Sequence, residues 1–183
     1  MITSTVACNS QKKYQVGKTT WRFDKPASYG YRVDNFSDAV QHGDSYIKEQ
    51  AKDIRLRDEE VVLVSVAKND SSDVNSIRAN YETNTNITRF TLKGYVEQLA
   101  AYFKQTYEEM GSKVESSISE STIDGIKFYV IESTVSHTES GYKYGTLTYI
   151  SEIDSKEFGI VATYDNDEDK KLILKSISSS SFN

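Results

Sequence analysis

The stretch TLKGYVEQLAAYFKQTYEEMGSKVESSISESTIDGIKFYVIESTVSHTESGYKYGTLTYISEIDSKEFGIVATYDNDEDKKLILKSISSSSF, residues 91–182, decides the fold of this chain. In its first part, apolar residues recur at steps of four and three, which is the face of a helix about five turns long. Thr91 stands at the N-cap position of this helix, and Gly111 stands where a left-handed residue commonly ends one. The residues of the apolar stripe are Leu92, Val96, Leu99, Phe103, Tyr107 and Met110.

A β-hairpin follows the predicted helix. Asp124-Gly125, between Ile123 and Ile126, supplies the positive φ angles of a two-residue type I′ turn. This turn fixes the pairing of Thr122 with Lys127, Glu120 with Tyr129, Ile118 with Ile131, and Val114 with Val135. We expect the face with Val114, Ile118, Tyr129, Ile131 and Val135 to pack under the helix, and the face with Phe128 and Val130 to be half covered.

Two further strands and a helix complete this half of the chain. Short connections make residues 142–153 and 158–164 antiparallel neighbours. The acidic run Asp165–Asp169 suits the positive N-terminal end of a last helix. Leu172, Ile173 and Ile177 are expected to dock this helix on the sheet.

The first ninety residues contain weaker signals. Pro26 cannot donate to a sheet, so a strand at residues 19–23 either lies at an edge or stops there. Residues 61–67 are β-branched and apolar on both faces, which predicts a central, buried strand. The remaining expectations are a short strand within residues 29–36, a helix at 45–56 with Asp44 as N-cap, a polar loop from Lys68 to Asn75, and a strand followed by a turn within 76–89.

Composition places the chain among folded single domains. It has 183 residues, a net charge of -5 and 37% hydrophobic residues, which is enough for one core. The acidic balance argues against a nucleic-acid partner, because phosphate binding needs a concentrated basic surface. No apolar run reaches the roughly 18 residues of a membrane span. We expect a disordered tether over residues 1–13 and a single domain over residues 14–183.

The lone cysteine has a suggestive context. Thr5-Val6-Ala7-Cys8-Asn9-Ser10 resembles the end of a bacterial lipoprotein signal, in which small residues precede a cysteine that becomes lipidated. The charged and apolar regions of such a signal are missing, and Thr5 replaces the usual aliphatic residue. Lipidation of Cys8 would place the chain on the bacterial cell envelope, and a true start at Met1 would place it in the cytoplasm. The alternative is a free cysteine in a frayed terminus.

Metal and cofactor signals are weak. Asp165, Asp167 and Asp169 have the spacing of a calcium-binding EF-hand loop, but Lys170 replaces its glycine and Ser176 its final glutamate. Helix capping is the better interpretation of this run. The sequence therefore predicts no metal, no cofactor and no catalytic residue.

Histidines and tyrosines are the remaining candidates. His42 and His137 both fall in polar loop contexts and lack the spacing of a triad or zinc site. Tyr142, Tyr144 and Tyr149 share one strand, and tyrosine is common at protein interfaces. The alternatives are a partner-binding face, with these three residues as candidates, and ordinary β-propensity on a half-exposed sheet.

The order of these elements resembles the PsbP-like family, which includes DcrB-like bacterial lipoproteins and Mog-type Ran-binding proteins. The resemblance spans roughly residues 19–182 and depends on the strand at Trp21–Pro26, the strand at Val61–Ala67, the Leu92–Met110 helix, the Asp124-Gly125 hairpin and the final helix. It implies an α+β fold: a curved antiparallel sheet of about six strands between helices, an α/β/α sandwich. The family shares no catalytic residues, and its members mostly act as binding or assembly factors.

These features predict a non-enzymatic accessory domain that binds a protein or peptide, tethered to a bacterial envelope through Cys8. An immunity or chaperone-like protein that binds a secreted effector is one form of this hypothesis. The rival is a small hydrolase or ligand-binding enzyme whose site assembles from loops around His42 and His137.

Overall fold

The computed structural model describes residues 11–32, 60–68, 74–83, 87–88 and 90–183. Over these ranges the chain forms ten strands and two helices. In chain order they are β1 (Lys12–Val16), β2 (Thr19–Phe23), β3 (Gly30–Tyr31), β4 (Glu60–Ala67), β5 (Ser76–Glu82), α2 (Leu92–Glu109), β6 (Ser112–Ile123), β7 (Ile126–His137), β8 (Lys143–Ile153), β9 (Lys156–Tyr164), α3 (Asp167–Ser178) and β10 (Ser181–Phe182). Cys8, His42 and the helix expected at 45–56 with its cap Asp44 lie outside the described residues.

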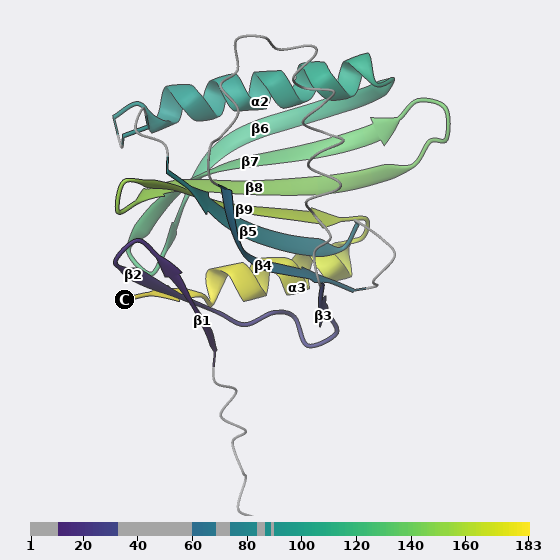
Figure 1. Cartoon of the computed structure of the whole chain (residues 1–183). Helices are drawn as coiled ribbons and strands as arrows, with labels where there is room; N and C mark the ends of the chain where they lie inside the picture. Colours follow the sequence, from purple (N-terminus) through teal and green to yellow (C-terminus); the bar gives the residue numbers. More distant parts are fainter. Residues whose placement is uncertain (1–10, 33–59, 69–73, 84–86, 89) are drawn as a thin grey trace, which may run out of the picture.

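The main sheet is antiparallel and has seven strands in the order β3-β4-β5-β9-β8-β7-β6 (Figure 1). The sequence predicted about six. A second sheet, β1-β2-β10, holds three strands. The predicted strand at residues 19–23 is β2, which stops before Pro26 and occupies the middle of this small sheet. The sequence assigned Lys12 and Lys13 to the tether. In the structure they belong to β1 and pair with Phe23 and Arg22 of β2.

The main sheet is covered on both faces, because its strands alternate their side chains between two cores. Ile131 and Ile150 face α2 and pack with Leu92, Val96 and Ala100. The opposite face packs against α3 and the small sheet, so α2 and α3 lie on opposite sides of the main sheet (Figure 1). The larger core includes Trp21, Phe23, Phe128, Val130, Leu147, Tyr149, Phe158, Ile160, Ile173 and Ile177. Phe128 and Val130 are therefore buried, not half covered as expected.

Helix α2 follows the predicted stripe only in its first half. Leu92, Val96 and Ala100 are buried, whereas Met110 is 64% exposed and lies beyond the last helical residue. Thr91 occupies the N-cap position, but its hydroxyl accepts a hydrogen bond from the Thr88 amide and caps no helical N–H. Gly111 has the predicted positive φ, 78°, and its N–H donates to the carbonyl of Glu108.

The hairpin β6–β7 has the predicted turn and register. Asp124 and Gly125 have φ angles of 47° and 80°, and all four predicted residue pairs are opposite one another. Val114, Ile131 and Val135 are buried as expected. Ile118 is 40% exposed, because it lies in the middle of β6 at the edge of the sheet.

Strand β4 differs from its prediction as a central, buried strand. It lies second from one edge, beside the two-residue β3. Its pairing with β5 shifts between Val62 and Val64, and Val61 and Val62 before the shift are exposed. Only the part of β4 from Leu63 onward, with Val64 and Val66, reaches the larger core.

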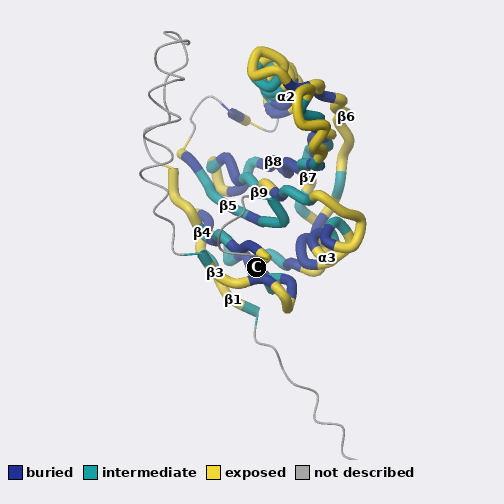
Figure 2. Tube along the Cα trace, turned by 90° about the vertical axis from the view of Figure 1, so that its right-hand side faces the viewer, coloured by how far each residue is buried: buried dark blue, intermediate teal, exposed yellow. Residues whose placement is uncertain are grey.

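Helix α3 begins at Asp167, with Asn166 as its N-cap. The Asn166 side chain accepts a hydrogen bond from the Asp169 amide, and three acidic residues occupy the first turn as predicted. Ile173 and Ile177 are buried against the sheet, but Leu172 is 40% exposed and does not dock the helix. The alternation of buried dark blue and exposed yellow along α3 is visible in Figure 2.

Candidate functional site

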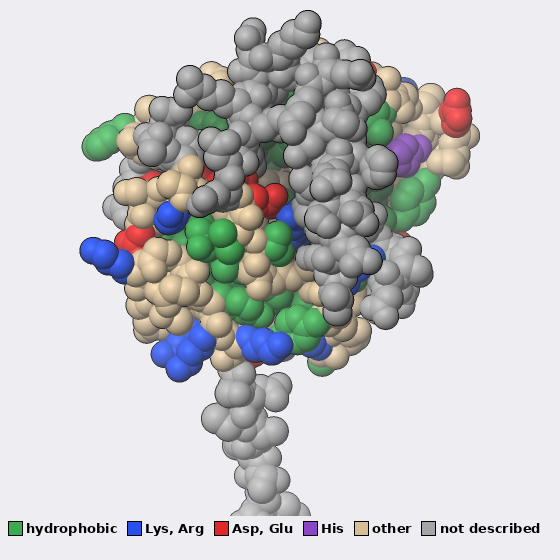
Figure 3. Space-filling view, in the orientation of Figure 1, with side chains coloured by type: hydrophobic (Ala, Val, Ile, Leu, Met, Phe, Trp, Pro, Cys, Tyr) green, Lys and Arg blue, Asp and Glu red, His purple; other side chains and the backbone are tan. Residues whose placement is uncertain are grey.

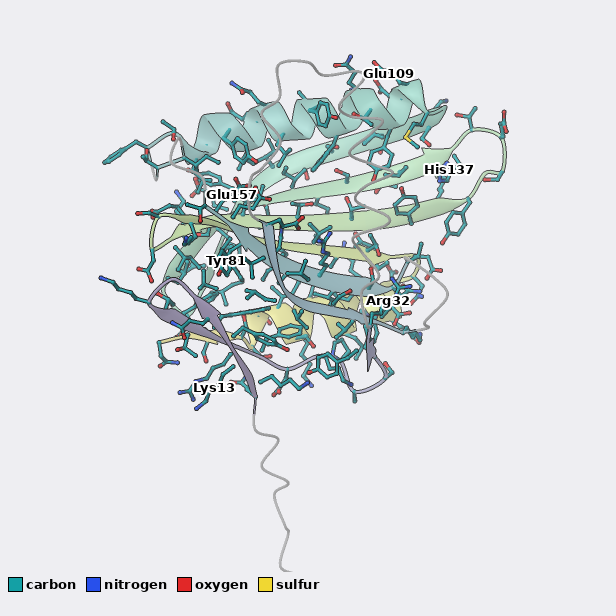
Figure 4. The ribbon with its side chains drawn as sticks, viewed as in Figure 1. Lys13, Arg32, Tyr81, Glu109, His137 and Glu157 are labelled. Carbon is teal, nitrogen blue, oxygen red and sulfur yellow. The ribbon has the colours of Figure 1, made fainter. Side chains whose placement is uncertain are left out.

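An aromatic cluster lies where β7 ends and β8 begins. The ring of His137 stacks on that of Tyr142, with centroids 6.3 Å apart, and lies 5.9 Å from that of Tyr144. The centroids of the two tyrosine rings are 6.1 Å apart. We call His137, Tyr142 and Tyr144 the aromatic site. Figure 4 places His137 near the β7–β8 turn, and Figure 3 shows a histidine (purple) at the surface beside hydrophobic side chains (green).

The β7–β8 turn holds these rings together. The His137 amide donates to the Tyr142 carbonyl, and the Gly141 amide donates to the His137 carbonyl, both at 2.9 Å. Gly141 has a φ of 68°, in the left-handed region that glycine adopts without a steric penalty. The Ser140 hydroxyl accepts from the Tyr142 amide at 3.2 Å. These bonds fix the backbone on both sides of the turn, so the rings are positioned before any partner binds.

The environment of the two tyrosines keeps both phenols protonated. Partial burial and then the Asp165 carboxylate raise the pKa of Tyr142. Burial and then the neighbouring Tyr107 hydroxyl of α2 raise the pKa of Tyr144 well above its usual range. Tyr142 remains 42% exposed. The site therefore offers neutral aromatic surface, with the two hydroxyl groups next to Asp165 and Tyr107.

A small pocket of about 150 Å³ adjoins the aromatic site, and Tyr144 lines both. Its other lining residues are Thr134, Lys143, Gly145, Tyr164, Asp165, Asn166 and Asp167. Sites for drug-sized ligands usually span roughly 300–1,000 Å³. The pocket is thus too small for such a ligand and suits one side chain of a larger partner.

One wall of the pocket is fixed by a cross-strand contact. Gly145 pairs with Tyr164 on β9, and a Cβ atom at Gly145 would overlap the Tyr164 ring. The Tyr164 hydroxyl and the Lys170 ammonium both donate to Glu132 Oε1, at 3.3 and 2.6 Å. The Lys170 ammonium also lies 5.2 Å from the Tyr164 ring centroid, a cation–π contact. Strand β9 and helix α3 therefore hold this ring in place.

Tyr149 does not belong to the aromatic site. It lies five residues after Tyr144 on β8, so the two side chains point to opposite faces of the sheet. Tyr149 is 7% exposed and packs edge-on against Phe128 in the larger core. Burial is the main cause that raises its pKa. Of the three predicted binding tyrosines, the structure brings Tyr142 and Tyr144 together and makes Tyr149 a core residue.

His137 of the aromatic site and its neighbour Tyr107 were not identified from the sequence as binding residues. His137 was weighed there only as a catalytic candidate, and Tyr107 was assigned to the stripe that α2 buries. The hairpin register places His137 opposite Ser112, directly after the end of α2. The signal was a histidine followed, across a glycine turn, by tyrosines five and seven residues later.

His137 also forms a hydrogen bond with Ser112, with 3.0 Å between Nδ1 and Oγ. This is the distance of a nucleophile and its general base. Ser112 is only 4% exposed, however. The His137 ring is positioned by stacking on Tyr142, whereas a catalytic histidine is oriented by a hydrogen bond to a carboxylate. The hydrogen bond to Ser112 can hold the His137 ring in position, but the buried Ser112 hydroxyl is not accessible to a substrate.

A row of glutamates crosses the opposite end of the sheet. Register places Glu60 opposite Glu82, Glu82 opposite Glu157, and Glu157 opposite Glu152, on strands β4, β5, β9 and β8. Figure 4 shows Glu157 at the other end of the sheet from His137. This row could not be predicted from the sequence, because it depends on the pairing of β5 with β9, which are more than seventy residues apart in the chain.

Three of these glutamates, Glu157, Glu60 and Glu152, accept hydrogen bonds from neighbouring groups. The Tyr95 hydroxyl of α2 donates to Glu157 Oε1 at 2.8 Å. Arg78 and Asn80 donate to Glu60 Oε1, and the Ser155 amide donates to Glu152 Oε1. These contacts tie α2 and the β8–β9 turn to the sheet, which is a structural role.

Neither metal nor membrane chemistry is visible in the part of the chain that the structure describes. Within it, no three His, Cys, Asp or Glu side chains are grouped so that they could hold a metal ion. Asp169, part of the acidic run with the one-three-five spacing of a calcium loop, accepts hydrogen bonds from Lys68, Tyr29 and Asn166. No helix among the described residues has the length and apolarity to cross a bilayer.

Comparison with known proteins defines the fold class. No family model and no curated protein matches the sequence. The structure is similar to the solution structure of cyanobacterial PsbP (CyanoP) from Synechocystis sp. PCC 6803, with a TM-score of 0.58 and 14% sequence identity, over 100% of this chain and 97% of that one. The chain therefore has the PsbP-like α/β sandwich fold, as the order of its elements predicted.

Proposed function

We propose that this chain is a non-catalytic accessory domain that binds a protein or peptide partner through the aromatic site. The observation that carries the proposal is the exposed ring of Tyr142, held against His137 and Tyr144 by the turn between β7 and β8. Tyrosine contributes a large contact area at low entropic cost, and pre-positioned rings lower that cost further.

Three features of the site support a macromolecular partner. The pocket beside Tyr144 has the size of a single side chain. Met110, 64% exposed at the end of α2, adds apolar surface close by, since the carbonyl of Gly111 accepts a hydrogen bond from the Thr138 amide. The PsbP-like fold, which the resemblance associates with binding and assembly factors, agrees with this role.

The partner's contact surface is expected to carry a basic side chain. Exposed Asp165 and Asp167 line the pocket together with Tyr144 and Tyr164. A lysine or arginine inserted there would meet carboxylates and aromatic faces together. The protein already uses this chemistry between Lys170, Glu132 and Tyr164.

The binding proposal is tested by quantitative pull-down from extracts of the native organism. Wild-type protein is compared with a Tyr142→Ser/Tyr144→Ser variant and with Leu172→Ser, which removes an equally exposed apolar side chain from α3. Partners enriched by wild type and by Leu172→Ser but lost from the double variant support the proposal. Equal capture by all three proteins, with folding verified by circular dichroism, contradicts it.

We further propose that Cys8 anchors the domain to a bacterial envelope, as its sequence context predicts. Mass spectrometry of the protein expressed in bacteria with its native upstream sequence tests this. A diacylglyceryl mass on the peptide that starts at Cys8, absent from Cys8→Ser, is expected. An unmodified Cys8 in the membrane-free fraction would remove the anchor without affecting the binding proposal.

A further inference from the structure

Strand β6 forms one whole edge of the main sheet. Among the described residues it pairs with β7 alone. It is 12 residues long, whereas β3 at the other edge has two residues. Figure 2 shows β6 along the outside of the molecule, largely in the yellow of exposed residues. The sheet therefore has one short edge and one long, open edge.

The hairpin geometry shows which backbone groups of β6 point outward. In a two-residue hairpin, the residues that flank the turn, Ile123 and Ile126, exchange both backbone hydrogen bonds. Bonded and non-bonded pairs then alternate along the ladder, and the register of β6 with β7 has no shift. The amides and carbonyls that point away from β7 consequently belong to Ser112, Val114, Ser116, Ile118, Glu120 and Thr122.

Among the residues that the structure describes, this edge lacks the features by which proteins usually block strand addition. Such features are prolines, bulges, lysines on the edge and covering segments. Strand β6 has no proline and no bulge, and its one lysine, Lys113, lies near its start. The charge of Glu120 is balanced by Lys127 at 2.8 Å. Small serine side chains occupy positions 116, 117, 119 and 121 and would not obstruct a second strand.

We propose that β6 pairs antiparallel with β6 of a second copy of this chain, about a two-fold axis at Ile118. The two seven-stranded sheets would then form one continuous sheet across the dimer. A two-fold axis perpendicular to the sheet keeps each face on its own side and makes the contact isologous. The outward backbone groups of Ile118, Ser116 and Val114 would bond those of Ile118, Glu120 and Thr122 of the other copy.

The charges and side chains of β6 favour its own copy as the occupant. In this register Glu115 lies opposite Ser121, Glu120 opposite Ser116, and Lys113 opposite Ile123, so no like charges meet across the interface. Ile118, 40% exposed in the single chain, packs against its own counterpart. Serine side chains already pair across the β6–β7 hairpin, where the hydroxyl oxygens of Ser116 and Ser133 are 2.8 Å apart.

The first test is the oligomeric state of the full chain, measured by sedimentation velocity over a range of concentrations. We expect a wild-type dimer that dissociates on dilution. Ile118→Lys places a charge at the two-fold axis and is expected to weaken the dimer by at least about tenfold. Leu172→Lys is the matched control, because Leu172 is also 40% exposed, and its dimer should equal that of wild type.

A backbone variant separates strand pairing from side-chain contact. Ser116→Pro removes an outward amide and breaks no bond to β7, so the variant should fold and be monomeric. If it fails to fold, Ile118→Lys alone decides the question. Either of two results overturns the proposal: a wild-type protein that is monomeric at every concentration, or an Ile118→Lys dimer as strong as that of wild type. An extended segment of another protein bound at β6 of the monomer would also overturn it.

Disulfide trapping tests the register in a Cys8→Ser background. Ile118→Cys faces its own counterpart across a bonded pair, about 5.5 Å between Cα atoms, which lies within disulfide range. Ser121→Cys faces Glu115 of the other copy and should not cross-link with itself. Rapid oxidation of Ile118→Cys alone supports the register, and equal cross-linking of the two variants contradicts it. The aromatic site is not altered by any of these changes, so partner capture is scored separately.

Discussion

Asp169 is a fully buried carboxylate that joins three parts of the chain. Its two oxygens accept hydrogen bonds from the Tyr29 hydroxyl, the Lys68 ammonium and the Asn166 side-chain amide. Burial raises the pKa of Asp169, but these three donors outweigh it, and the net result is a lowered pKa. The sequence placed Asp169 in an acidic run at a helix start, and only the fold reveals the partners that make it a structural anchor.

Replacing Asp169 should alter the acid stability of the protein. Because its pKa in the folded state is below that of the unfolded chain, about 3.9, the carboxylate stabilises the fold above that pH, and this stability is lost as pH falls through the folded pKa. Asp169→Asn should lower the free energy of unfolding at pH 7 by about 2 kcal/mol.

Urea denaturation at pH 7 and at pH 3 measures this effect. The gap between wild type and Asp169→Asn should narrow at the lower pH, because the unfolded wild-type chain takes up a proton at this residue more readily than the folded chain does. Asp167→Asn is the control, because Asp167 is an exposed residue of the same helix turn. An equal gap at the two pH values would show that the carboxylate charge is not what stabilises this junction.

The tyrosines of β8 should separate by role. Tyr149→Ala removes a buried aromatic side chain and should cost about 3 kcal/mol of stability. Tyr142→Ala removes a ring that is 42% exposed and should cost less than about 1 kcal/mol. Thermal and urea unfolding of the two variants measure the difference. A Tyr142→Ala protein as unstable as Tyr149→Ala would mean that the aromatic cluster is built for stability and not for contact with a partner.

At the scale of elements, the features that could be predicted are those set by residues close together in the sequence. Asp124-Gly125 fixed both the turn and the twelve-pair register of β6 with β7. The periodic stripe fixed α2, and the acidic run fixed the start of α3. These features depend on residues close in sequence, so they could be predicted correctly.

Features set by distant pairing could not be predicted in this way. The exposed position of Val61 and Val62 depends on where β4 lies in the sheet and on its shifted register with β5. Met110 and Leu172 fit helical stripes, but Met110 lies one residue beyond the end of α2, and Leu172 is exposed beside the buried Ile173 of α3. For the same reason, Tyr142, Tyr144 and Tyr149 could be placed together on one strand, but the face of β8 that forms the larger core, which buries Tyr149, could not be predicted.

The Gly145–Tyr164 pair gives a prediction for the β8–β9 element. Gly145→Ala adds a methyl group where the Tyr164 ring now lies, so the ring must move and its contacts with Glu132 and Lys170 must loosen. We expect a loss of about 1–3 kcal/mol. Gly94→Ala on α2, where a Cβ meets nothing within 4 Å, should instead raise stability by up to about 1 kcal/mol.

Urea unfolding of the two glycine variants provides the comparison. If Gly145→Ala were as stable as wild type, the Tyr164 ring would not be held against the strand, and the wall of the pocket would be mobile. Such a result would weaken the pocket as part of the binding site.

At the scale of the molecule, the C-terminal strand β10 joins the two sheets. The Thr20 amide donates to the Asn183 carbonyl, the Asn183 amide donates to the Thr20 carbonyl, and the Phe182 amide donates to Asp124 Oδ2. The Phe182 ring lies within 6 Å of the rings of Phe128 and Phe158, measured between centroids. The small sheet, the β6–β7 hairpin and the larger core therefore meet at Phe182.

Phe182→Ala tests whether these parts unfold together. Loss of the half-buried ring should lower the free energy of unfolding by about 2 kcal/mol, and the transition should remain single because both sheets share one core. Circular dichroism and tryptophan fluorescence, which reports on Trp21 of β2, should give coincident curves. Fluorescence that changes well before the circular dichroism signal would mean that the small sheet unfolds independently of the main sheet.

The most direct test of the binding role is site-specific photo-cross-linking in living cells. p-Benzoylphenylalanine, an aromatic residue whose benzoyl group cross-links on irradiation, replaces Tyr142 in one strain and Leu172 in another. We expect a discrete covalent adduct with one partner protein from position 142 and none from position 172. No adduct from position 142, or the same adducts from both positions, would contradict a partner-binding surface at the β7–β8 turn.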